Sequence, residues 1–179
     1  MWQNCPIWGT ENPHAYIEKP THPKRVTVYC GFWSKDIIEP IFLENEHGEA
    51  ITVNGDRYRA MLNEYLFTKI EEENIGNIWF QQIGATCRTA EATLDVFSPV
   101  FEDRIISSRA NVVWPPRSCD LTPLNYYGGA VKNKCYVNKP ETIDALNDNI
   151  LEAIGEIQLH TINTVLKNCT DRVGFCMAS

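Results

Sequence analysis

The pattern of apolar and polar positions predicts a chain of alternating strands and helices. Residues 26–33 alternate and are rich in β-branched and aromatic types, and a second apolar run covers residues 37–43 after a polar break. This pair predicts a β-hairpin. Asn54-Gly55-Asp56 supplies turn and capping chemistry, and the apolar residues that follow recur at helical spacing. The sequence therefore predicts a helix over residues 56–73.

The remaining segments continue the alternation of strands and helices. Short strands are predicted at residues 77–82 and 104–107, with a short helix over 89–97 between them. Two amphipathic stripes, 143–157 and 159–173, predict helices that meet at a break near Gln158. This order of elements is typical of an α/β domain. Residues 1–23 carry several prolines and little periodicity, so we expect an extended lead-in there and one domain over residues 24–175.

Length and charge narrow the functional classes. A chain of 179 residues with 44% hydrophobic content can bury one core. The formal net charge of −7 argues against strong affinity for free DNA, which binds proteins mainly through lysine and arginine. No apolar run approaches the roughly 20 residues that span a bilayer, and the segment from Trp2 to Pro6 is no signal-peptide start. We therefore expect an intracellular protein that is not secreted and has no membrane partner and no small-molecule substrate.

The cysteines and histidines do not form a recognisable metal site. The seven cysteines are odd in number and far apart, without a Cys-x-x-Cys pair, which is typical of reduced thiols. The four histidines lie in unrelated contexts without ligand spacing. We expect no metal bound by these residues.

Two motifs contain positions, 83 and 125, that we single out as candidate catalytic positions. Residues 79–86, Trp-Phe-Gln-Gln-Ile-Gly-Ala-Thr, form a predicted strand that ends in a glycine turn, with Ile83 where an enzyme usually places a carboxylate. Residues 114–126 contain two prolines and a Leu-Thr-Pro-Leu run, and they direct Asn125 into the start of a helix predicted over 126–134. Gly128 and Gly129 weaken that helix by about 1 kcal/mol each relative to alanine.

Together with residues 25–34 and 53–58, these two motifs resemble the mariner-like DDE/DDD transposases of animal genomes over nearly the whole chain. The resemblance implies an α/β fold with an RNase H-like mixed sheet flanked by helices. It also implies a sheet that is incomplete at its N-terminus, because the family's first acid lies upstream of the segment that matches residues 2–9. Members of the family cut and rejoin transposon ends with two Mg²⁺ or Mn²⁺ ions, which need carboxylate ligands.

The chain departs from the family pattern at the catalytic positions. Ile83 stands in place of the second acid and Asn125 in place of the third, with 41 residues between them (84–124). Arg88 replaces the histidine that commonly follows the second acid. The segment at residues 127–129 is one residue shorter than the family's Phe-Leu-Trp-Gly, which we expect to disturb the helix. No catalytic residue is retained on this interpretation, and no cofactor is expected.

The Pro-rich motif has a structural and a functional interpretation. We expect Asp120 to fix the turn before the Leu-Thr-Pro helix start, as aspartate often does, together with a structural role for Trp114, Pro115 and Pro116. Trp114 and Arg117 either contact a phosphate backbone or pack and pair on the surface. A metal nuclease that uses Asp95, Asp103 and Asp120 is a more distant alternative, since nothing in the sequence brings the three together.

Two functions follow from the resemblance. The first is a transposase-derived, nuclear, nucleic-acid-binding domain without cleavage or strand transfer; its candidate DNA-binding residues are Lys24, Arg25, Arg117, Lys132 and Lys134. A solvated basic face is the alternative for these side chains. The second is a DNA- or protein-interaction module that forms a homodimer or pairs with intact transposases. We also expect reduced stability, because the strands beside a missing central strand would have unpaired edges unless residues 1–8 fill the gap.

Overall fold

The computed structural model describes residues 25–82, 84–114, 118 and 121–178 of the chain, so the lead-in predicted over 1–23 lies outside the described residues. Strands and helices alternate as the apolar pattern predicts. In chain order the elements are β1 (Val28–Phe32), β2 (Ile37–Phe42), α1 (Gly55–Met61), the π-helix η1 (Leu62–Leu66), α2 (Phe67–Glu72), β3 (Phe80–Gln81), α3 (Thr86–Thr89), α4 (Glu91–Phe101), β4 (Ile105–Ser107), β5 (Val112–Val113), α5 (Pro123–Cys135), α6 (Ile143–Gly155) and α7 (Leu159–Ala178).

The first two strands form the predicted antiparallel hairpin. Tyr29 pairs with Ile41 and Gly31 with Ile38, so two steps along β1 match three along β2 and the extra residue lies on β2. The bulge includes Pro40, which has no N–H to donate to a strand ladder. β1 therefore keeps a regular alternation, and its even and odd residues point to opposite faces.

The other described strands form a separate parallel sheet in the order β3–β4–β5. The N–H groups of Phe80 and Gln82 donate to the carbonyl oxygens of Arg104 and Ile106, at 2.9 and 3.1 Å. β5 was not predicted, because a two-residue strand is too short to show a period. The described residues thus contain both antiparallel and parallel pairs, divided between two sheets.

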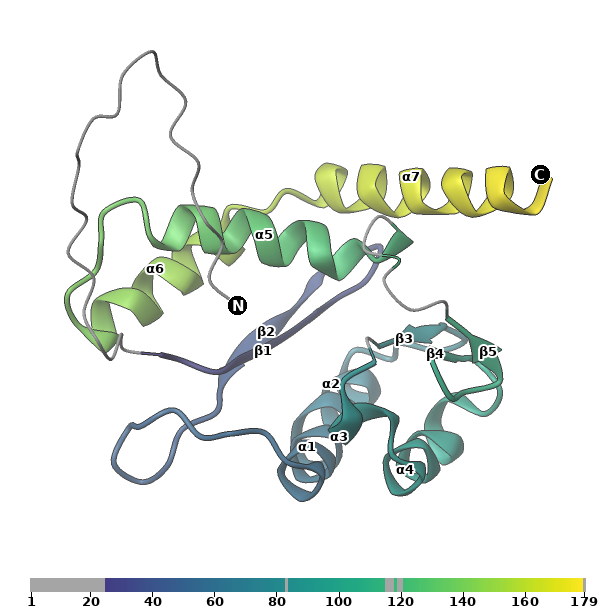
Figure 1. Ribbon diagram of the computed structural model, residues 1–179, viewed down its shortest axis with the longest axis horizontal. Coiled ribbons are helices and arrows are strands. Elements are labelled where there is room, and N and C mark those ends of the chain that lie inside the picture. Colours follow the sequence, from purple (N-terminus) through teal and green to yellow (C-terminus); the bar gives the residue numbers. More distant parts are fainter. Residues whose placement is uncertain (1–24, 83, 115–117, 119–120, 179) are drawn as a thin grey trace, which may run out of the picture.

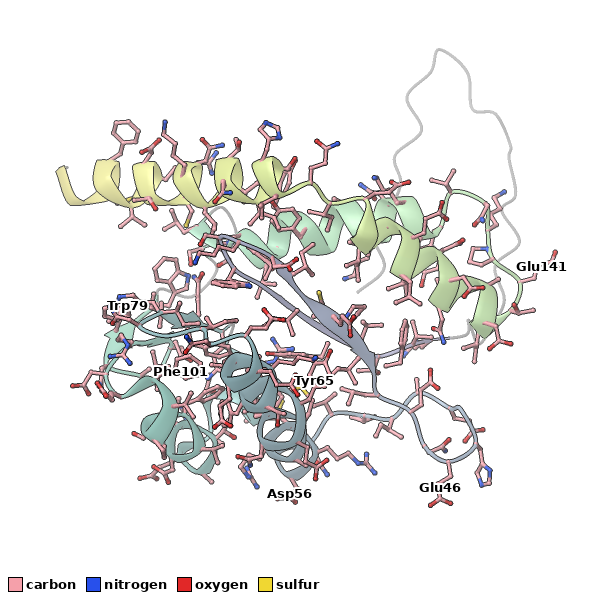
Figure 2. The ribbon with its side chains drawn as sticks, turned by 180° about the vertical axis from the view of Figure 1, so that it is seen from behind. Glu46, Asp56, Tyr65, Trp79, Phe101 and Glu141 are labelled. Atoms are coloured by element: carbon pink, nitrogen blue, oxygen red, sulfur yellow. The ribbon has the colours of Figure 1, made fainter. Side chains whose placement is uncertain are left out.

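The helix predicted over residues 56–73 forms as one helical stretch, α1–η1–α2. The side chain of Asn54 caps its start by accepting a hydrogen bond from the N–H of Arg57, at 2.9 Å. The π-helical turn in its middle has no signature in the apolar spacing. Tyr65 lies on this turn and donates its hydroxyl to the carbonyl of Glu39 at 2.8 Å, which ties the helix to the hairpin (Figure 2).

Two apolar cores lie on the two sides of the hairpin (Figure 1). On one side, the α1–η1–α2 stretch and α4 pack an aromatic core around the fully buried Phe97 and Phe101, whose rings contact those of Phe67 and Phe80. On the other side, α5 and α6 pack against the hairpin. Val28 and Cys30 of β1 pack against this second core, whereas Tyr29 and Trp33, the residue after β1, pack against the first. One strand therefore serves both layers.

The expected disturbance of the helix at residues 127–129 is wrong. α5 runs unbroken through Gly128 and Gly129, and a Cβ at either position would meet nothing within 4 Å. Packing of Tyr127 and Cys135 into the core compensates for the weak glycine propensities. Helix α4 also extends four residues beyond the predicted end, to Phe101.

None of the helices in the described part of the chain combines the length and the apolar character that spanning a bilayer requires.

Candidate functional site

A buried polar network lies where β3 ends, at the position that the sequence singled out. Gln82 is only 3% exposed. Its Oε1 accepts a hydrogen bond from the hydroxyl of Tyr58 at 3.1 Å, and its Nε2 donates to the backbone carbonyl of Arg88 at 3.0 Å. Both ends of the buried amide are thus satisfied, as a polar group in a core requires. The network joins α1, the end of β3 and helix α3.

Aromatic rings and one cation complete this network. The guanidinium of Arg88 lies over the ring of Tyr58, 5.6 Å from its centroid. The ring of Tyr29 on β1 meets that of Tyr58 edge to face, with centroids 6.3 Å apart. Burial raises the pKa of Tyr58 to about 12 and also raises the pKa of Tyr29, while the Arg88 charge partly opposes both shifts. Both phenols are therefore neutral at physiological pH.

The turn from β3 into α4 is held by side-chain bonds to its backbone. Thr93 donates its hydroxyl to the carbonyl of Cys87 at 2.9 Å, and Arg59 on α1 donates to the same Thr93 oxygen at 3.4 Å. Gly84 lies close to Ser108, because a Cβ on this glycine would meet the serine Oγ at 3.4 Å. Ile83, the position of the family's second acid, lies outside the described residues.

Asn125 lies in the first turn of α5 and is exposed, with its N–H donating to the carbonyl of Thr122 at 2.9 Å. The start of this helix is tied to the end of β5. Trp114 donates its Nε1–H to Thr122 Oγ1 at 3.4 Å, and that hydroxyl donates to the carbonyl of Ser118 at 3.0 Å. The observed contacts of Trp114 are thus within the protein. Pro115, Pro116, Arg117 and Asp120 lie outside the described residues, so their proposed roles stay predictions.

The described basic residues proposed to bind nucleic acid lie just before β1 and on α5. Arg25 and Lys132 are exposed, and Lys132 lines a cavity together with Val26, the residue that follows Arg25. Lys134 forms a 2.6 Å ion pair with Glu156, which neutralises its charge locally. Lys24 and Arg117 lie outside the described residues.

Among the described residues, no group of side chains fits a two-metal centre. Within the described ranges no three His, Cys, Asp or Glu side chains come together. Asn125 offers a neutral amide oxygen, a weaker ligand than a carboxylate for Mg²⁺ or Mn²⁺, and isoleucine at position 83 offers no ligand atom. Asp95 lies on α4 and Asp103 follows it, but the structure gives them no common site. Cys30, Cys87, Cys135 and Cys176 are free thiols.

Comparison with solved structures shows what this architecture is. The chain superposes on the catalytic domain of the Mos1 mariner transposase with a TM-score of 0.65 and 18% identity, over 88% of this chain and 75% of that one. The chain has the mariner transposase catalytic-domain fold. A Mos1 transposase paired-end complex with the left transposon end matches at a TM-score of 0.68 and 16% identity, over 96% of this chain and 49% of that one. No family model and no curated protein matches the chain.

The Mos1 likeness confirms the predicted α/β, RNase H-like fold class. The chain spans about half the length of the Mos1 transposase in its paired-end complexes, 49% in two of them. Sequence reasoning missed the Tyr58–Gln82–Arg88 network. Tyr58 falls on the apolar stripe of its helix, and that spacing by itself indicates only a core position. A tyrosine in such a stripe is nevertheless a signal that a buried partner for its hydroxyl is near.

Proposed function

We propose that this chain is a mariner transposase-derived domain that binds nucleic acid and has lost two-metal DNA cleavage and strand transfer. The observation that carries the proposal is the pairing of a transposase catalytic-domain fold with neutral residues at the acid positions. Two cations about 4 Å apart need several anionic oxygens to hold them. Asn125 and Ile83 supply none, and no carboxylate cluster among the described residues replaces them.

Weak, salt-sensitive DNA binding is the activity that remains on this proposal. Arg25 and Lys132 are exposed and can contact phosphates, whereas Lys134 is paired with Glu156. The net charge of −7 opposes association with a polyanion, so we expect modest affinity. Two of the structures that share this fold are Mos1 paired-end complexes, and one of them is described as containing the left transposon end. On this proposal the protein acts in the nucleus, where the DNA is.

A metal-titrated DNA binding and cleavage assay tests the proposal. The purified chain is mixed with a labelled duplex at two salt concentrations, with Mg²⁺, with Mn²⁺ and with neither. The expected result is binding that weakens steeply with salt and is unaffected by metal, with no nicked product. Metal-dependent nicking that co-purifies with the chain would refute the loss of activity. Absence of binding at the lower salt concentration would refute the nucleic-acid role.

Charge variants connect the binding to named residues. Lys132→Gln removes an exposed positive charge from α5 and should lower the slope of log affinity against log salt by about 1 if the ammonium contacts a phosphate. Arg109→Gln is the control, because it removes one exposed positive charge from the loop between β4 and β5, on the opposite side of the hairpin from α5 (Figure 1). Equal effects of the two variants would show that only the net charge matters.

A second candidate function is pairing with a transposase subunit, including a second copy of this chain. It is favoured by two apolar side chains exposed beside the parallel sheet: Trp79, 56% exposed, which precedes β3, and Val113, 69% exposed, on β5. Figure 2 shows Trp79 at the periphery of this part of the molecule. Light scattering with wild type and with a Trp79→Ser/Val113→Thr variant tests it. A dimer that the variant abolishes supports pairing. A wild type that is monomeric and does not bind an intact transposase subunit when the two are mixed excludes it.

A further inference from the structure

The outer edge of β1 carries backbone groups that no other described residue binds. Toward β2, the Thr27 carbonyl accepts from Leu43 at 2.8 Å and the Trp33 N–H donates to Asp36 at 3.0 Å. Since β1 is regular, its odd residues bond β2 and the backbone groups of Val28, Cys30 and Phe32 face the other way. Among the described residues, β1 is an edge strand of a two-stranded sheet.

β3 presents a second edge of the same kind. The backbone N–H groups of Phe80 and Gln82 donate to β4, so the backbone of Gln81, between them, faces away from β4. The sheet order makes β3 an edge strand among the described strands. The Nε2 of Gln81 is buried without a described hydrogen-bond partner. Tyr58 contacts both strands. Its ring meets that of Tyr29 on β1, and its hydroxyl donates to Gln82 at the end of β3. The two edges are therefore held near one another without a strand in common.

An apolar cavity adjoins the free edge of β1. Its volume is about 450 Å³, within the range of ligand pockets. The residues whose backbone faces outward, Val28, Cys30 and Phe32, also point their side chains into it, and α5 and α6 supply the far wall. Tyr127 lines the cavity against Phe32, with ring centroids 4.7 Å apart, and its buried hydroxyl has no described partner.

On the face of β1 opposite the cavity lies the positive charge of Arg88. Arg88 is half-buried over Tyr58 and forms no ion pair with a described residue. The odd residues of β1 face this side, as the Tyr29–Tyr58 contact shows. An occupant beside β1 would thus meet an apolar cavity on one face and a guanidinium on the other. A small apolar molecule could fill the cavity, but it could not bond the row of backbone groups beside it.

We propose that the edge of β1 accepts an extended strand from another polypeptide, with apolar side chains at alternate positions and a carboxylate on the opposite face. Main-chain hydrogen bonds to Val28, Cys30 and Phe32 hold the added strand, as in other cases of strand addition. Its apolar side chains enter the cavity, and its carboxylate pairs with Arg88. Lys132, a proposed phosphate contact, lines the same cavity. The strand is held by the backbone of β1, however, so this proposal does not depend on DNA binding.

Hydrogen exchange with a defined peptide tests the proposal. The probe is the blocked heptapeptide Val-Thr-Val-Glu-Val-Thr-Val, whose valines share one face and whose glutamate lies on the other. The full chain is labelled with ¹⁵N, and amide exchange is measured with and without the probe. We expect the amides of Val28 and Phe32 to exchange about tenfold more slowly with peptide, while that of Val113 on the far edge of the parallel sheet is unchanged.

Three controls make the result specific. A probe N-methylated at alternate residues cannot form the ladder and should give no protection. A probe with lysine in place of glutamate should protect less, and Arg88→Gln, which keeps the backbone carbonyl that Gln82 uses, should abolish the preference for glutamate. Unchanged exchange with the probe overturns the proposal. It is also overturned if Val28 and Phe32 are already protected in the free chain, since the edge is then filled by the chain's own residues or by a second copy.

Discussion

Replacing Tyr58 by phenylalanine isolates one buried hydrogen bond. The ring is 2% exposed, and phenylalanine keeps its contacts with Tyr29 and Arg88. Only the 3.1 Å bond to Gln82 Oε1 is lost, and the oxygen that remains is buried. A neutral hydrogen bond contributes about 0.5–1.5 kcal/mol and an orphaned acceptor costs about 1–3 kcal/mol. We therefore expect the free energy of unfolding to fall by about 1–2 kcal/mol, allowing for partial relaxation around the oxygen.

Thermal and urea unfolding of purified protein measure this change. For a chain of this size the melting temperature should fall by about 2–4 °C per kcal/mol. Tyr65→Phe is the matched control, because its hydroxyl bonds the Glu39 carbonyl at 2.8 Å in an exposed setting where water can replace it. We expect less than about 0.5 kcal/mol for the control. If Tyr58→Phe costs no more than Tyr65→Phe, the network at the end of β3 does not stabilise the fold.

The same tyrosine makes a prediction about pH. Burial raises the pKa of Tyr58 from 10.0 to about 12, so the folded state favours the neutral phenol. This contribution to stability is fully present below pH 10 and is lost as the pH rises through about 12. Wild type should therefore lose stability over that interval, and Tyr58→Phe should lose less. Parallel pH profiles for the two proteins would contradict the assignment.

Three further predictions concern a pair of glycines, a pair of cysteines and one helix cap. Gly129→Ala, in open space on α5, should raise the free energy of unfolding by up to about 1 kcal/mol. Gly48→Ala, at a φ of 72°, should lower it by about 1 kcal/mol. Changes of the same sign in the two free energies, measured by urea unfolding, would contradict this. Burial raises the Cys30 thiol pKa from 9.0 to about 11, so iodoacetamide at pH 8 should label exposed Cys176 at least about tenfold faster, as mass spectrometry would show. Asn54→Ala removes the cap of α1 and should cost about 1 kcal/mol in urea unfolding.

Local patterning was enough to predict most elements of the fold. The alternation of residues 26–33 and the apolar run at 37–43 indicate the hairpin, and the spacing after Asn54 indicates the long helix. Both signals arise from side chains that must face a core at periods of 2 or 3.6 residues. The two-residue strand β5 and the π-turn at 62–66 have no such period, and helix α5 survives its two glycines because packing outweighs propensity.

The candidate site divides in the same way between sequence and structure. The sequence alone determined that no carboxylate occupies positions 83 and 125, because the chemical identity of a side chain does not depend on the fold. Only the tertiary structure decided which groups meet. Tyr58, Gln82 and Arg88 come from three separate segments, and Val28, Tyr127 and Ile150 line one cavity although they are far apart in the chain. Such contacts depend on the packing of whole layers, which no local period encodes.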